Sequence, residues 1–209
     1  MELIKEKIHM DHCQELAYTQ ISLEEDQNIS DQKPDALRVI CKKADVRIGE
    51  TKVLEDSVLI KGVLVYQVLY LTDETEKRLC SMNGEIPFDE KIYTNHSCMY
   101  DEVRVAARAE DITIRLINSR KMNIRCIVTA SVLRDSLYDE EVVTDVENPS
   151  ACEILKKTIA VTSIALDTRD IFRIKDEFTI PDGYPNIYEL LWKNIRVDGL
   201  AFVPMDGGI

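Results

Sequence analysis

The densest group of potential metal ligands lies near the N-terminus and consists of His9, Asp11, His12 and Cys13. Imidazole, carboxylate and thiolate groups are the ligands that zinc takes in proteins. The spacing matches no zinc finger. In an extended segment successive side chains point to opposite faces, which separates His9 and Asp11 from His12. We therefore assign no metal ligand to this group.

A histidine next to two nucleophiles is the second arrangement that could do chemistry. The segment Thr94–Cys98 places His96 beside the hydroxyl of Ser97 and near the thiol of Cys98. Nucleophilic catalysis needs a base that points at its nucleophile, and neighbours in sequence rarely point at one another. The chain also has no Gly-x-Ser-x-Gly elbow. We interpret the segment as a polar exposed loop and predict no catalytic residue.

Two acidic runs, Glu24–Asp26 and Asp139–Glu141, offer carboxylates that could act as acid and base or bind calcium. Neither run has the Asp-x-Asp-x-Asp-Gly pattern of a calcium loop, and charge runs usually form solvated loops. The chain also has no glycine-rich loop that would cradle a phosphate. The sequence therefore predicts a non-enzymatic protein without a cofactor or metal site.

Composition and charge narrow the possible partners. The chain has 209 residues and a formal charge of -12, which repels a phosphate backbone and argues against nucleic acid. No stretch approaches the roughly 18 apolar residues of a spanning helix, and the charged N-terminus lacks the apolar core of a signal peptide. We expect cytosolic synthesis and no membrane insertion. The six cysteines form no Cys-x-x-Cys motif, so we expect reduced, mostly buried thiols.

The N-terminal part of the chain resembles its own C-terminal quarter at an offset of 151 residues, the distance that separates Glu2 from Glu153. Identical residues recur in both copies, among them the pairs Lys5 and Lys156, Ile8 and Ile159, Asp31 and Asp182, Pro34 and Pro185, and Lys42 and Lys193. This repeat predicts a first unit at 1–137, an acidic linker at 138–152 and the first part of a second unit at 153–209. We expect the chain to be a piece of a longer protein.

A short helix is expected in each unit, over 34–40 and 185–191. In both places a proline is followed by Asp or Asn and then by an apolar pair, as at a helix start. Proline would fix the entry to that helix. Trp192, which aligns with Cys41, falls beside Leu191 at a position that we expect to pack in the core.

The rest of the first unit reads as strands. Residues 58–71 are rich in β-branched and aromatic side chains, which favour a pleated surface, and only Lys61 and Gln67 interrupt an otherwise buried pattern. Residues 122–133 alternate with a period of two, and 118–121 join them to the preceding strand as a hairpin. We predict a mainly β fold, a β-sandwich or open barrel with one short helix per unit and an incomplete second unit.

Five segments together resemble the SPOCS domain of the SipL-like spore-coat morphogenesis family. They are Lys33–Asp35, Ile60–Tyr70, Gly84–Phe88, Leu116–Lys121 and Phe172–Asp176, and the resemblance covers essentially the whole chain. In that family the domain usually occurs as tandem copies ahead of a C-terminal LysM module, which this sequence lacks. The resemblance implies a mother-cell cytoplasmic protein that tethers coat layers at the forespore surface. It also implies a spore morphogenetic ATPase as partner, and it brings no catalytic residues.

Two kinds of function remain open. The first is a structural interaction module that docks a protein partner or self-associates through exposed strand edges, which carry unpaired backbone groups. The second is a glycan-binding module, associated with peptidoglycan, that would need an exposed aromatic platform. Tyr66 and Tyr70, on one face of a predicted strand, are the candidates for that platform.

Overall fold

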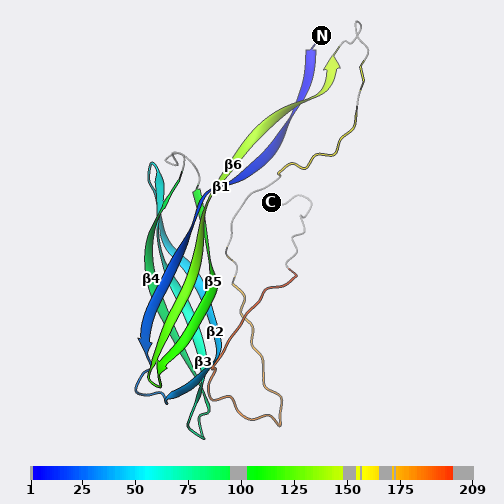
Figure 1. The fold of residues 1–209 in the computed structure, drawn as a ribbon. Coiled ribbons are helices and arrows are strands. Elements are labelled where there is room, and N and C mark those ends of the chain that lie inside the picture. The colour runs from blue at the N-terminus through cyan, green and yellow to red at the C-terminus, as the bar shows by residue number, and fades with distance from the viewer. Residues whose placement is uncertain are drawn as a thin grey trace. The chain divides into compact units, whose positions relative to one another are not determined.

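The computed structural model describes residues 2–94, 103–147, 154–155, 157–164, 171 and 173–199. Its regular secondary structure in this part consists of strands alone (Figure 1): β1 (Glu2–Asn28), β2 (Ala36–Val53), β3 (Ser57–Thr72), β4 (Leu79–Tyr93), β5 (Val103–Asn118) and β6 (Lys121–Glu147). They form two three-stranded antiparallel sheets with the orders β1-β6-β5 and β2-β3-β4. The predicted mainly β fold is confirmed.

The chain divides into two compact units. The core unit comprises Gln14–Arg134 and Ile180–Asp198, and the ribbon unit comprises Met1–Cys13, Asp135–Thr179 and Gly199–Ile209. β1 and β6 each contribute a segment to both units. Within the described residues, no helix is long and apolar enough to cross a membrane.

The hydrophobic core of the core unit lies on the inner faces of the two central strands. On β3 the fully buried residues are Val58, Ile60, Leu64, Tyr66, Val68 and Tyr70, and on β6 they are Met122, Ile124, Cys126, Val128, Ala130 and Val132. Both sets recur every second residue, as a pleated strand requires. Burying one large aliphatic side chain contributes about 1.5–3 kcal/mol, so these two strands hold most of the core.

The predicted hairpin between β5 and β6 is confirmed. Asn118 pairs with Lys121, which leaves Ser119 and Arg120 as a two-residue turn. A tight connection also joins β2 to β3, where the Leu54 amide donates to the Ser57 carbonyl at 2.8 Å. β2 and β5, which are edge strands of different sheets, lie side by side in the core unit.

The predicted short helices are wrong. β2 begins at Ala36, and Ala36 is in register with Thr72 of β3. The β-branched residues Val39 and Ile40 suit this strand, and pairing with β3 satisfies backbone groups that a helix would have satisfied internally. The matched residues 185–191 form no regular secondary structure. A proline followed by Asp or Asn marks a turn as readily as a helix start.

The predicted acidic linker begins as strand. Residues 138–147 belong to β6, and the remaining 148–152 lie outside the described residues. The division of the chain into one complete and one partial repeat unit stays a prediction.

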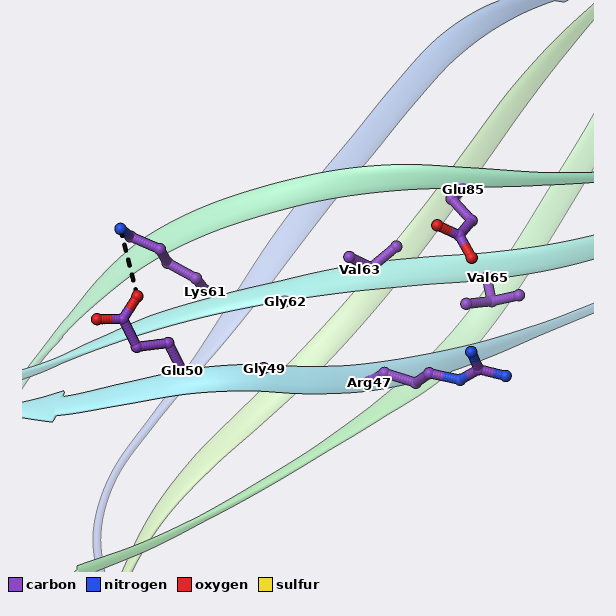
Figure 2. A pocket seen from close by; sticks show the side chains of 8 residues that line it. All are labelled: Arg47, Gly49, Glu50, Lys61, Gly62, Val63, Val65 and Glu85. Carbon is purple, nitrogen blue, oxygen red and sulfur yellow. Dashed lines mark ion pairs between the residues drawn. The ribbon is translucent and has the colours of Figure 1, made fainter.

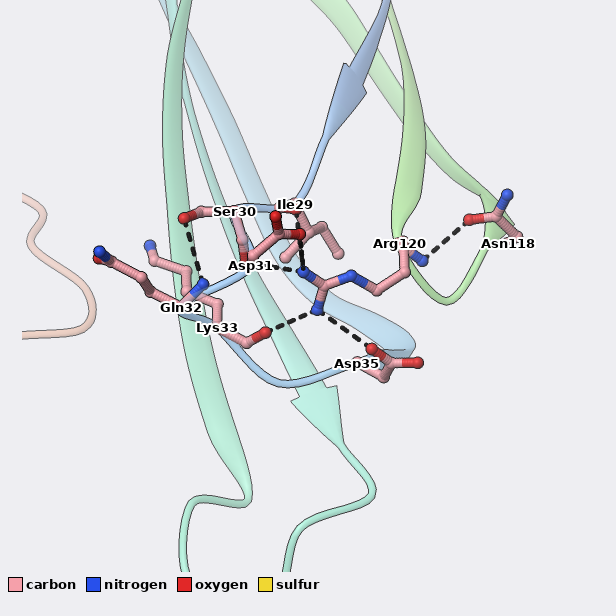
Figure 3. Close-up of polar contacts among 8 residues, drawn as sticks. All are labelled: Ile29, Ser30, Asp31, Gln32, Lys33, Asp35, Asn118 and Arg120. Carbon is pink, nitrogen blue, oxygen red and sulfur yellow. Dashed lines mark hydrogen bonds and ion pairs between the residues drawn. The ribbon is translucent and has the colours of Figure 1, made fainter.

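Arg120 joins the β5–β6 turn to the connection between β1 and β2 (Figure 3). Its guanidinium donates to carbonyl and carboxylate oxygens of that connection: Lys33 O (2.6 Å), Ser30 O (2.9 Å), Ile29 O (3.2 Å), Asp31 Oδ1 (3.1 Å) and Asp35 Oδ1 (3.1 Å). Hydrogen bonds from Ser119 and then Arg120 hold the pKa of Asp35 below its usual value. One side chain thus satisfies most of the polar groups where the chain passes between the sheets.

Two glycines of the β2-β3 pair differ in the space around them. A Cβ at Gly62 would lie 2.5 Å from the Phe88 ring and 2.9 Å from the Arg47 carbonyl, whereas at Gly49 it would meet only the Lys61 carbonyl at 3.8 Å. We expect Gly62→Ala to lower the free energy of unfolding by about 1–3 kcal/mol, because the core must shift. Gly49→Ala should change it by less than about 0.5 kcal/mol. Urea unfolding followed by circular dichroism measures both, and equal effects would contradict the packing described here.

Candidate protein-interaction face

In the group His9–Cys13, to which no metal ligand was assigned, His9 contacts a carboxylate of the same ribbon unit. His9 Nδ1 lies 2.6 Å from Asp139 Oδ1, and Lys7 Nζ lies 3.7 Å from Asp139 Oδ2. The hydrogen bond with His9 is the main cause that lowers the pKa of Asp139. His12 and Cys13 are exposed. Across the part of the chain that the structure describes, no group of three or more His, Cys, Asp or Glu side chains is placed to hold a metal ion.

The other candidate clusters either form ion pairs with a neighbouring strand or lie outside the described residues. His96, Ser97 and Cys98 are among the residues not described. Of the acidic runs, Asp26 accepts from Asn123 Nδ2 at 2.9 Å and pairs with Lys121 Nζ at 2.8 Å. Glu141 pairs with Lys5 at 3.0 Å. The acidic runs therefore belong to strands and pair with cations of the neighbouring strand, rather than forming solvated loops.

The aromatic platform expected at Tyr66 and Tyr70 is wrong. The two side chains are 1% and 0% exposed and point into the core. Burial is the main cause that raises the pKa of each phenol to about 12. They share their face of β3 with Leu64 and Val68, so the alternation that groups them also buries them. A sugar cannot stack on either ring.

Four cysteines are described, and two of them are buried. Cys80 and Cys126 lie in the core, whereas Cys13 and Cys41 are exposed. The expectation of mostly buried thiols therefore fails for Cys13 and Cys41. Burial raises the pKa of the Cys126 thiol to about 11.

Alkylation of the native chain with iodoacetamide at pH 8 should therefore label Cys13 and Cys41 and spare Cys80 and Cys126. The thiolate is the reacting species, and at Cys126 both burial and the raised pKa suppress it. Peptide mass mapping of native and urea-unfolded protein measures the difference. Rapid native labelling of Cys126 would show that the inner face of β6 is open to solvent.

The β2-β3-β4 sheet has one face that points away from the core, which we call the outer face. On β3 this face carries Val63, Val65 and Gln67. Val63 and Val65 are half-buried, and Gln67 is only 8% exposed. A polar residue is this strongly buried on an outward face only if something covers it.

An extended segment of the same unit, Glu189–Lys193, covers Gln67, and we call it the docking segment. Gln67 Nε2 donates to the Leu191 carbonyl at 3.1 Å, and Lys43 Nζ donates to the Lys193 carbonyl at 2.5 Å. Lys43 Nζ also lies 5.5 Å from the centre of the Trp192 ring. Trp192 and Leu191 are half-buried here. The prediction that Trp192 packs in the core is therefore wrong.

An ion pair fixes the other end of the docking segment. Lys77 Nζ lies 3.1 Å from Glu189 Oε2, and the hydrogen bond to Glu189 is the main cause that raises the pKa of Lys77. Exposed ion pairs contribute about 0–1 kcal/mol, and an exposed cation–π contact about 0.5–1 kcal/mol. The docking segment is therefore held by several weak contacts.

Beside the docking segment the outer face contains an open hollow of about 320 Å³. Its lining residues are Arg47, Gly49, Glu50, Lys61, Gly62, Val63, Val65 and Glu85. Figure 2 shows Val65 between the side chains of Arg47 and Glu85. Lys61 pairs with Glu50 at 3.4 Å, whereas the structure gives Arg47 and Glu85 no ion pair with any described residue.

This arrangement is better suited to binding a polypeptide than to catalysing a reaction. The hollow offers an apolar floor with Arg47 and Glu85 at its rim, beside the Lys61–Glu50 ion pair. The neighbouring part of the same face already binds an extended segment. The backbone groups of β3 are paired on both sides, with β2 and β4. Side chains must therefore provide the recognition.

A comparison with protein-family models matches residues 35–117 to the family described as SipL, SPOCS domain. This match supports a SPOCS-domain protein, with the domain at residues 35–117. The matched residues include all of β2, β3 and β4, and all of β5 except Asn118. The match is narrower than the whole-chain resemblance that the sequence suggested. No match was found among curated proteins or among solved structures.

The hollow lies entirely within the SPOCS domain, as do Lys43, Gln67 and Lys77. The docking segment lies outside the matched residues. Sequence reasoning missed the outer face because Arg47 and Glu85 are ordinary charged strand residues. One signal was present, since an apolar run on both faces of a strand indicates cover on both sides, and residues 58–71 form such a run.

Trp192 is the single tryptophan of the chain, so its fluorescence reports on the docking segment. We expect Lys43→Ala to shift its emission to longer wavelength and to increase quenching by acrylamide, because the ring loses its contact and gains water. Lys52→Ala, which removes an exposed lysine of the same strand, is the matched control and should leave the spectrum unchanged. An unchanged spectrum in Lys43→Ala would show that the contact does not exist in solution.

Proposed function

We propose that this chain is a non-catalytic structural module of spore coat or envelope assembly that docks onto a morphogenetic partner protein through the outer face of its SPOCS domain. Membership of the SPOCS family indicates a sporulation-related, non-enzymatic domain. The partner suggested by the family resemblance is a spore morphogenetic ATPase. The proposed location is the mother-cell cytoplasm, at the forespore surface or in the coat.

The outer face is the observation that carries this proposal. Its covered half holds an extended segment through side chains of Lys43, Gln67 and Lys77. Its open half has the half-buried Val65 between Arg47 and Glu85, which form no ion pair with any residue that the structure describes. A partner segment with an apolar side chain flanked by opposite charges would complement the hollow, because buried apolar area provides affinity and charges at the rim provide orientation.

The glycan alternative is not favoured by any observation of the described residues, because the tyrosines on which it depended are buried. The candidate catalytic groups that are described also point to structural roles. His9 contacts Asp139, and the carboxylates of Asp26 and Glu141 pair with lysines.

Capture of the morphogenetic ATPase by the immobilised chain tests the proposal. We expect Val65→Glu to weaken capture at least about tenfold, equivalent to about 1.4 kcal/mol, since a carboxylate would enter the apolar floor of the hollow beside Glu85. Arg115→Glu changes an exposed residue of β5 in the other sheet and is the matched control. It should bind as the unmodified chain does.

Circular dichroism and urea unfolding must show that both variants are folded. Equal capture by Val65→Glu and by the unmodified chain would exclude the hollow as the docking site. Absence of capture by the unmodified chain would exclude this partner.

A further inference from the structure

The docking segment points to a second occupant of the outer face. We propose that Glu189–Lys193 exchanges between molecules, so that the covered half of the outer face binds the docking segment of a second copy of this chain. The inference uses the same sheet as the proposed function, but it concerns self-association and requires no other protein.

The contacts define what this half of the outer face recognises. Two of them, from Gln67 and Lys43, are made to backbone carbonyls, which an extended chain presents regardless of its side chains. The other two contacts depend on particular side chains of the segment. Lys77 binds the carboxylate of Glu189, and Lys43 lies over the aromatic ring of Trp192, three residues after Glu189. The chain's own sequence Glu189-Leu190-Leu191-Trp192 meets these requirements, and a second copy supplies the identical segment.

Charge complementarity favours a segment of this chain. The whole chain carries a formal charge of -12, yet the two charged side chains that hold the docking segment, Lys43 and Lys77, are both basic. A basic site on an acidic protein attracts acidic segments, and Glu189 is the residue that pairs with it. The attraction acts equally on a docking segment from the same molecule and on one from another molecule.

The surroundings of the docking segment permit exchange. Residues 173–199 form no helix or strand, and the contacts of the segment with the described residues of the outer face come from side chains and not from sheet pairing. Apolar side chains within and beside the segment remain in solvent, with Leu190 71%, Tyr188 91% and Ile195 85% exposed. Exchange of an identical element preserves every contact and is a low-cost route to association.

The local concentration of chains determines whether the docking segment binds its own molecule or a second copy. A segment tethered to its own face acts at an effective concentration in the millimolar range, which favours the intramolecular contact in dilute solution. Association becomes competitive when many copies are gathered on one surface, and it gains further if the exposed apolar neighbours of the segment are buried at the same time.

Two complementary variants test the exchange. The acceptor variant, Glu189→Gln with Trp192→Ala, keeps the lysines of the outer face and contains no tryptophan. The donor variant, Lys43→Glu with Lys77→Glu, keeps the docking segment and its tryptophan but cannot seat it on its own face. When the acceptor is titrated into the donor, we expect the Trp192 emission to shift to shorter wavelength and its anisotropy to rise to saturation.

The matched control combines all four substitutions in one chain, which removes both lysines and the two segment side chains, Glu189 and Trp192, that they contact. Titrating it into the donor variant should change neither the emission nor the anisotropy. Sedimentation of the donor and acceptor mixture should show a complex with the mass of two chains. Each variant alone should sediment as one chain, and circular dichroism confirms that each is folded.

An unchanged Trp192 signal on titration with the acceptor would overturn the inference, and so would an equal change with the four-substitution control. These results are independent of the proposed function. The ATPase test depends on Val65 in the hollow, whereas this test depends on Lys43, Lys77, Glu189 and Trp192 and contains no ATPase.

Discussion

The guanidinium of Arg120 holds together the point at which the chain leaves one sheet and enters the other. The connection from β1 to β2 directs the carbonyls of Ile29, Ser30 and Lys33 toward it, and the carboxylates of Asp31 and Asp35 complete the set of acceptors. The amides of Ile29 and Ala36 in turn donate to the Arg120 and Ser119 carbonyls. The start of β2, and hence its register with β3, depends on this junction.

β3, which pairs with β2, contributes both to the core and to the proposed binding surface. Its inner side chains are buried against β6 and form the core. Its outer side chains are nearly as apolar, and they form the floor of the hollow and the seat of the docking segment. Stability thus comes from one face of the strand, and binding is proposed for the other.

The strand positions and the β5–β6 hairpin could be predicted because a period of two and turn residues are local signals. The predicted helices failed because residues 34–40 found hydrogen-bond partners in β3, which is distant in sequence. Tyr66 and Tyr70 were correctly grouped on one face of β3, but that face is the inner one. Trp192 was expected in the core because its repeat position suggested it, whereas its contact with Lys43 joins residues about 150 apart.

The sequence by itself determined the β class of the fold, the hairpin at 118–121, the acidic charge and the resemblance to the SPOCS domain. These depend on residue type and local spacing, which the sequence states directly. Only the tertiary structure decided which face of β3 is covered by a sheet and which by Glu189–Lys193. It also placed Arg47 and Glu85 around Val65. Alternation divides a strand into two faces, but the burial of each face depends on residues brought to it from elsewhere in the chain.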